Sequence, residues 1–174
     1  MKNVIFRYGI ISGLVIASLM LITTLITKAT ASKAASFEYG MIIGYTNMVL
    51  AFSVVYFAMK KYRDSHNNDK LSIREGLLIG LGVTTIATIF YSLMWLFVYY
   101  NIIPNFIDEY SAYALDKLMT SGAKEIEIEQ HQKGMDSFRE MYQTPFSIFL
   151  ITLIEPLPVG VLVTVISTMF LRKK

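Results

Sequence analysis

The sequence predicts an all-α, polytopic membrane protein with four transmembrane helices and an external helical hairpin between helices three and four. Two observations predict this class. Charged residues leave four long intervals that are almost free of charge, and each can supply the roughly twenty residues that a spanning helix needs. The segment between the third and fourth intervals is rich in charge, and no other loop is long enough to fold by itself. We therefore expect residues 1–174 to form a single membrane domain.

Composition excludes several classes of function. Hydrophobic residues make up 54% of the chain, and cysteine is absent, which excludes disulfides and thiolate chemistry. The net charge of +3 does not indicate nucleic-acid binding, because the basic residues flank the spans instead of forming one patch. His66 and His131 belong to different loops, so we expect no metal site and no cofactor. No nucleophile–base pair or phosphate loop is present either, which argues against an enzyme.

The first three spans are expected at about 8–27, 39–59 and 76–101. Each contains a Gly-x-x-x-Gly pair, which leaves a flat helix face where another backbone can approach closely. We expect these glycines to pack the helices of one chain together, with a homo-oligomer interface as the alternative. The pairs are Gly9 and Gly13, Gly40 and Gly44, and Gly76 and Gly80.

The fourth span, about 146–171, contains one carboxylate, Glu155, close to Pro156 and Pro158. A charged residue inside a span is costly and indicates a functional site, while the prolines remove backbone donors and break the helix. Two interpretations remain open. Glu155 is either a proton or cation site of a transporter, or a hydrogen-bonded carboxyl that joins the broken helix to a tyrosine, a threonine or Asn47.

The external segment, about 102–145, is predicted to form two helices. Apolar residues recur at three-to-four spacing as far as Thr120, and Ser121-Gly122 then ends the helix. A second helix is expected from about Lys124 to Tyr142. We expect the two helices to form a hairpin that lies over the outer face of the bundle.

The distribution of Lys and Arg predicts the orientation of the chain in the membrane. Ten basic residues lie at the two termini and in the 60–76 loop, and six lie in the 27–38 and 102–145 segments. Because short cytoplasmic segments carry an excess of Lys and Arg, both termini are predicted in the cytoplasm. The long 102–145 loop is then periplasmic in a bacterial inner membrane.

Two stretches resemble the signatures of a bacterial inner-membrane family, the domain of unknown function 4199, which is typical of Bacteroidetes. They are FEYGMIIGYTNMVLAFSVVYFAMKKYRD, ending at Asp64, and PFSIFLITLIEPLPVGVLVTVISTMFLRKK, which contains Glu155, Pro158 and Gly160. The resemblance covers essentially the whole chain and implies four membrane helices without an assigned activity. It also draws attention to Tyr62, Arg63 and Asp64 as contacts for a lipid headgroup or a partner.

Two functions follow as hypotheses from these observations. The first is a small accessory or scaffold subunit of a larger membrane complex or membrane-bound enzyme, with the lipid bilayer and one membrane protein as partners. The alternative is a small-solute or proton-coupled transporter that uses the intramembrane carboxylate Glu155. Loss of activity with retained folding in Glu155→Gln would favour the transporter over the subunit.

Overall fold

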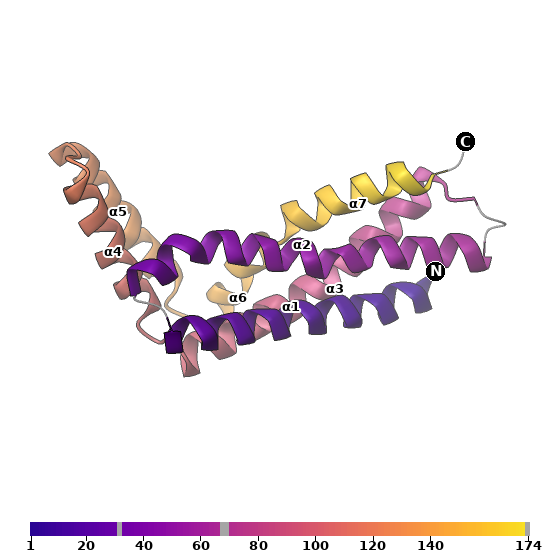
Figure 1. Cartoon of the computed structure of the whole chain (residues 1–174), viewed down its shortest axis with the longest axis horizontal. Helices are drawn as coiled ribbons and strands as arrows, with labels where there is room; N and C mark the ends of the chain where they lie inside the picture. Colours follow the sequence, from indigo (N-terminus) through magenta and orange to yellow (C-terminus); the bar gives the residue numbers. More distant parts are fainter. Residues whose placement is uncertain (31–32, 67–69, 173–174) are drawn as a thin grey trace.

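The computed structural model describes residues 1–30, 33–66 and 70–172, and these residues contain seven α-helices. Four long helical segments run along the same axis, and a shorter pair lies at one end (Figure 1). Both chain termini lie at the opposite end. The helices are α1 (Lys2–Thr30), α2 (Lys33–His66), α3 (Ile73–Asn101), α4 (Phe106–Thr120), α5 (Glu125–Met141), α6 (Pro145–Ile154) and α7 (Leu157–Leu171).

The prediction of an all-helical protein with four membrane helices is confirmed. Four segments are long and apolar enough to cross a membrane, and α6 and α7 together form the last of them. The first two segments extend past the expected spans at both ends and the third at its start, where charged residues continue the helix, whereas the fourth agrees with its expected span to within one residue. The segments are Lys2–Ala29, Phe37–Ser65, Ile73–Asn101 and Pro145–Leu171.

Helix α3 begins with the capping pattern that its sequence indicates. The Ser72 side chain accepts a hydrogen bond from the Glu75 backbone N–H, and Glu75 accepts one from the Ser72 backbone N–H. This reciprocal arrangement satisfies two backbone donors that a helix start leaves without partners. It fixes where α3 enters the bundle.

Glycines on α1 and α3 bring these two helices into close contact. A Cβ atom at Gly9 would lie 2.8 Å from Ile86, and one at Gly13 would lie 2.6 Å from Phe90. The same offset along the two helices recurs where Gly82 of α3 faces Ile5 of α1. The constant offset shows that α1 and α3 run parallel, with each glycine receiving a large apolar side chain from its neighbour.

The interface between α3 and α7 pairs glycine with threonine. The order of the pairs reverses between the two helices, so α3 and α7 run antiparallel. A Cβ atom at any of these glycines would lie under 3.0 Å from its threonine partner, which shows that the two backbones approach closely. The pairs are Gly76 with Thr168, Gly80 with Thr164, and Gly160 with Thr84.

Gly40 and Gly44 differ from the other glycine pairs. No heavy atom of the described residues lies within 4 Å of a Cβ built at either position, so the expectation that this pair packs helices within the chain is not met. This part of α2 is open to its surroundings, and Met41 and Ile42 beside the glycines are 69% and 65% exposed. The flat face of this motif does not itself specify a neighbour.

Helices α4 and α5 lie side by side at the end of the bundle, but they do not cover it as expected. The pair extends away from the spanning helices, and ring contacts with α2 lie along the first half of α4 (Figure 1). There the Phe37 ring of α2 packs against the rings of Phe106 and Tyr110 in α4. Few side chains of the pair are buried: Ile107 is the buried residue of α4, and Met135 is the buried residue of α5. The two helices contact each other more than they contact the bundle.

Candidate functional site

The last membrane segment is broken at its single carboxylate. Helix α6 ends at Ile154, and α7 begins at Leu157 after a turn formed by Glu155 and Pro156. Pro156 and Pro158 have no backbone N–H, so the helical hydrogen bonds to the Thr152 and Ile154 carbonyls cannot form. The break therefore places a carboxyl beside free backbone acceptors within a hydrophobic segment.

Tyr91 of α3 holds this carboxyl. Its hydroxyl donates a hydrogen bond of 2.9 Å to Oε2 of Glu155. Tyr91 is buried at 8% exposure, whereas Glu155 is exposed on the surface of the chain. The carboxyl thus has one hydrogen-bonding partner inside the bundle, and part of it faces outward from the spans.

The two residues meet because their depths match. Glu155 lies ten residues after Pro145 at the start of α6, and Tyr91 lies ten residues before Asn101 at the end of α3. At 1.5 Å per residue, both lie about 15 Å from the same boundary, which is near the middle of a hydrocarbon core of about 30 Å.

Polar and aromatic side chains extend from this pair towards the end of the bundle that carries α4 and α5. Tyr142, just before α6, lies near Thr152 of α6 and Trp95 of α3. Burial raises the pKa of the Tyr142 hydroxyl above its ordinary value, and the Thr152 and Trp95 side chains oppose that shift. Glu155 and Tyr99 add smaller contributions in the same direction as burial. Tyr142 is therefore neutral at ordinary pH.

The structure separates Asn47 from Glu155, although both were candidates for one site. The Asn47 amide Nδ2 donates a hydrogen bond of 3.3 Å to the Thr23 hydroxyl of α1. Asn47 therefore joins α2 to α1. Gly160 likewise serves the contact with Thr84 of α3, so only the two prolines remain beside the carboxyl.

The Tyr62–Asp64 triplet lies at the other end of α2 from this site and makes local contacts. The Tyr62 hydroxyl donates a hydrogen bond of 3.3 Å to Glu75 at the start of α3. The Arg63 guanidinium is 2.8 Å from the Asp64 carboxylate, which therefore competes with any phosphate for this side chain. These contacts favour a role in joining α2 to α3 over a headgroup site at Arg63.

Sequence reasoning did not single out Tyr91, Tyr142 and Trp95 as neighbours of the carboxyl. Tyr91 and Trp95 belong to the third expected span, and Tyr142 ends the second helix expected in the external segment. The matching depth of Tyr91 and Glu155 was a usable signal. The glycine pair Gly76 and Gly80 indicates one packing face of α3, but the sequence does not show which helix meets that face.

Three buried hydroxyls follow the carboxyl along the interface of α3 and α7. The Oγ1 atoms of Thr84, Thr88 and Thr164 have no hydrogen-bond partner among the described residues. Buried polar groups normally find a partner in protein or water. This interface is therefore more polar than the rest of the bundle. The described residues contain no group of three or more His, Asp and Glu arranged to hold a metal ion.

These features define a small polytopic helical membrane protein in which one carboxyl at mid-span reaches the surface of the bundle. The chain belongs to the family described as Protein of unknown function (DUF4199), whose family model matches residues 7–173. No curated protein and no solved structure matches the chain. The family membership agrees with the resemblance seen in the sequence and assigns no activity.

Proposed function

We propose that this chain is a small accessory or scaffold subunit that assembles with another membrane protein or a membrane-bound enzyme. The observation that supports the proposal is the exposure of Glu155 on the outer surface of the spans. Tyr91 supplies one hydrogen bond, and the rest of the carboxyl has no partner among the described residues. A subunit interface covers such a group.

The cost of leaving this carboxyl in lipid supports an interface at this position. An ionisable side chain at the centre of a membrane helix costs about 2.5–3.5 kcal/mol on insertion scales, and more in hydrocarbon without water. A partner helix that presents a hydroxyl, amide or basic group at the same depth removes part of that cost. The partner is therefore expected to carry a hydrogen-bond donor near mid-span.

The α6 side of the bundle has room for such a partner. Among the described residues, helix α6 packs mainly against α3. Its buried residues are Ile148 and Thr152, whereas Phe146 and Ile154 are 71% and 66% exposed. The apolar residues alone suit lipid or protein equally, and Glu155 in the same region favours protein.

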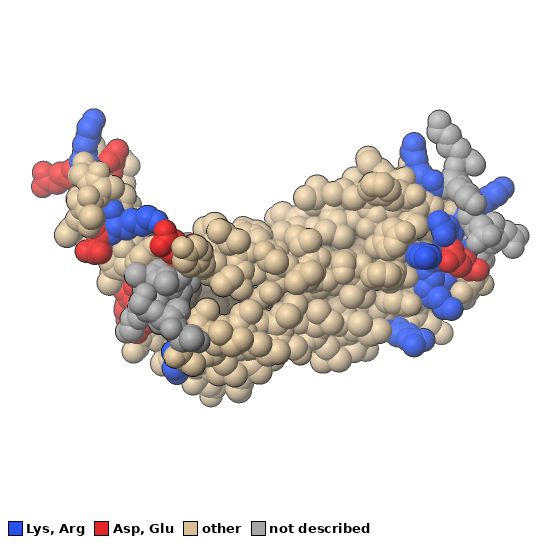
Figure 2. Space-filling model, in the orientation of Figure 1, with Lys and Arg blue, Asp and Glu red and all other residues tan. Residues whose placement is uncertain are grey.

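The proposed location is the bacterial inner membrane, with both termini cytoplasmic and α4 and α5 periplasmic. Lys and Arg predominate over Asp and Glu at the end that holds the termini, whereas the two signs are more evenly mixed at the α4–α5 end (Figure 2). This distribution is the one that the positive-inside rule associates with a cytoplasmic end. The proposal assigns the chain no catalytic reaction of its own.

A transporter that uses Glu155 is the second candidate. The observation that favours it is the set of unpartnered hydroxyls at Thr84, Thr88 and Thr164, which continue inward from the carboxyl along α3 and α7. Such groups suit internal water. In this case Glu155→Gln abolishes solute or proton flux in proteoliposomes while fold and abundance remain unchanged.

The subunit proposal is tested by purification from the native host membrane in mild detergent. Wild type, Glu155→Ala and a control variant, Leu162→Ala, are compared by mass spectrometry at equal abundance. Leu162 is 60% exposed on α7 and carries no polar group. We expect one stoichiometric partner with wild type and with the control, and loss of that partner with Glu155→Ala. A chain that purifies alone from the host would refute the proposal.

A further inference from the structure

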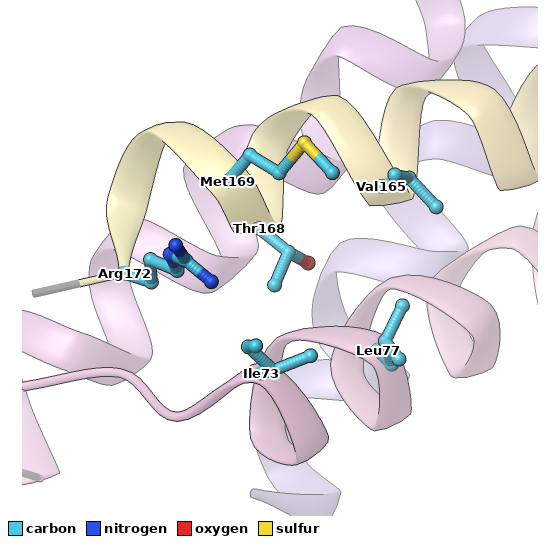
Figure 3. A pocket seen from close by; sticks show the side chains of 6 residues that line it. All are labelled: Ile73, Leu77, Val165, Thr168, Met169 and Arg172. Atoms are coloured by element: carbon cyan, nitrogen blue, oxygen red, sulfur yellow. The ribbon is translucent and has the colours of Figure 1, made fainter. Parts of the chain in front are cut away.

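A small hollow lies between the first turns of α3 and the last turns of α7. Its volume is about 160 Å³. The side chains around it come from both helices and leave it open on one side (Figure 3). The lining residues are Ile73, Leu77, Val165, Thr168, Met169 and Arg172.

The lining is apolar except at Arg172. The Thr168 hydroxyl already donates to the Thr164 carbonyl at 2.8 Å, so it contributes mainly its methyl group to the hollow. Among the described residues Arg172 makes no ion pair, and its guanidinium is directed towards the space between the two helices (Figure 3). The hollow therefore combines an apolar floor with a cation at its rim that has no ion-pair partner in the described part of the chain.

The position of the hollow along the spans indicates the chemistry of its occupant. It lies at the end of the molecule where Lys and Arg gather (Figure 2). This end of the spans is at the level of the lipid headgroups, and the proposed orientation places it on the cytoplasmic side. Glu75, in the first turn of α3, does not line the hollow and is bonded to Ser72 and Tyr62. Of the residues that the structure describes, no Asp or Glu lines the hollow beside Arg172.

We propose that this hollow binds one acyl chain of an anionic phospholipid whose headgroup phosphate pairs with Arg172. In a phospholipid the phosphate lies at the membrane boundary and the acyl chains lie below it, which is the same order as Arg172 at the rim and the apolar side chains of the hollow. Arginine suits the phosphate because its planar guanidinium donates two parallel hydrogen bonds. The site is independent of Glu155 and of the proposed subunit role.

The headgroup contact sets the size of the expected preference. One basic residue near an anionic membrane surface contributes about 1 kcal/mol, which corresponds to about fivefold in a binding constant. The expected result is that the delipidated protein binds phosphatidylglycerol about fivefold more tightly than phosphatidylcholine. Arg172→Gln removes that preference.

The experiment is a lipid titration of the detergent-solubilised full chain, followed by native mass spectrometry. Arg74→Gln is the matched control for charge, because Arg74 is exposed in the same turn of α3 as Ile73 and does not line the hollow. Val165→Phe fills the hollow, and Ile166→Phe adds the same ring at a neighbouring position outside it. Circular dichroism checks the fold of every variant.

The proposal expects that Arg172→Gln loses the preference for phosphatidylglycerol and that Val165→Phe weakens binding of both lipids, with both controls unchanged. Equal binding of the two lipids by the wild type overturns it, as does the same loss in Arg74→Gln. Inorganic phosphate alone is titrated in parallel. Displacement of the lipid by phosphate at equal concentration would show a free-anion site and would also overturn the proposal. Should Val165→Phe fail to fold, the comparison of the two arginine variants remains decisive.

Discussion

Replacement of Gly160 by alanine tests the close approach of α7 to α3. The new Cβ would lie 2.3 Å from Cγ2, 2.8 Å from Oγ1 and 3.1 Å from Cβ of Thr84. Ordinary contacts of this kind are 3.4–4 Å, so the nearest pair of atoms must separate by at least 3.4 − 2.3 = 1.1 Å. Rotation of the Thr84 side chain moves Cγ2 and Oγ1 but leaves its Cβ in place, so the helices must also shift. Overpacking of this kind costs about 1–3 kcal/mol.

The measurement is reversible unfolding in mixed micelles, followed by circular dichroism. Gly44→Ala is the control, because no described atom lies within 4 Å of its Cβ position, and a change below about 1 kcal/mol is expected from helix propensity. Adding Thr84→Ala to Gly160→Ala removes the two nearest atoms and should restore most of the lost stability. The reasoning is wrong if Gly160→Ala is as stable as Gly44→Ala, or if the double variant shows no recovery.

Three further predictions concern side-chain contacts. Tyr91→Phe should lower the free energy of unfolding by about 0.6–2 kcal/mol, and the loss should disappear in a Glu155→Ala background, as a double-mutant cycle would show. Because burial raises the pKa of Tyr142, its neutral form is favoured in the folded state, and stability should fall as pH rises above about 10; ultraviolet titration should show that Tyr142→Phe removes one tyrosinate that forms above that pH. Asp108→Asn removes the exposed ion pair with Arg139 between α4 and α5, so a loss of at most about 1 kcal/mol that vanishes at high salt is expected from thermal unfolding.

The sequence was sufficient for the class of fold because charge determines which segments can enter a bilayer. The four intervals that are almost free of charge predicted four spanning segments. Helix rotation was harder to predict. A spanning helix is apolar on every side, so its pattern does not show which neighbour each face meets. Asn47 therefore reads equally well as a partner of Glu155 or of Thr23, and the structure selects Thr23.

Glycine motifs show the same limit. Gly76 and Gly80 pack against α7, whereas the identical spacing at Gly40 and Gly44 faces open space. The motif indicates only that another backbone can approach closely. Whether a neighbouring helix is present depends on how the helices are arranged in the bundle. The break at Glu155 was predictable, since proline chemistry is local. The exposure of Glu155 could not be predicted, because it depends on which helices pack beside α6.

The most direct test of the proposed subunit interface is photo-cross-linking in native membranes. A photoreactive amino acid replaces Ile154, which is 66% exposed beside Glu155, or Leu162, which is 60% exposed further along the same segment. We predict an adduct with one membrane protein from position 154 that is lost when Glu155 is also changed to alanine, and no protein adduct from position 162. Adducts with lipid only, or with a second copy of this chain only, would contradict the assignment of Glu155 to an interface with a different protein.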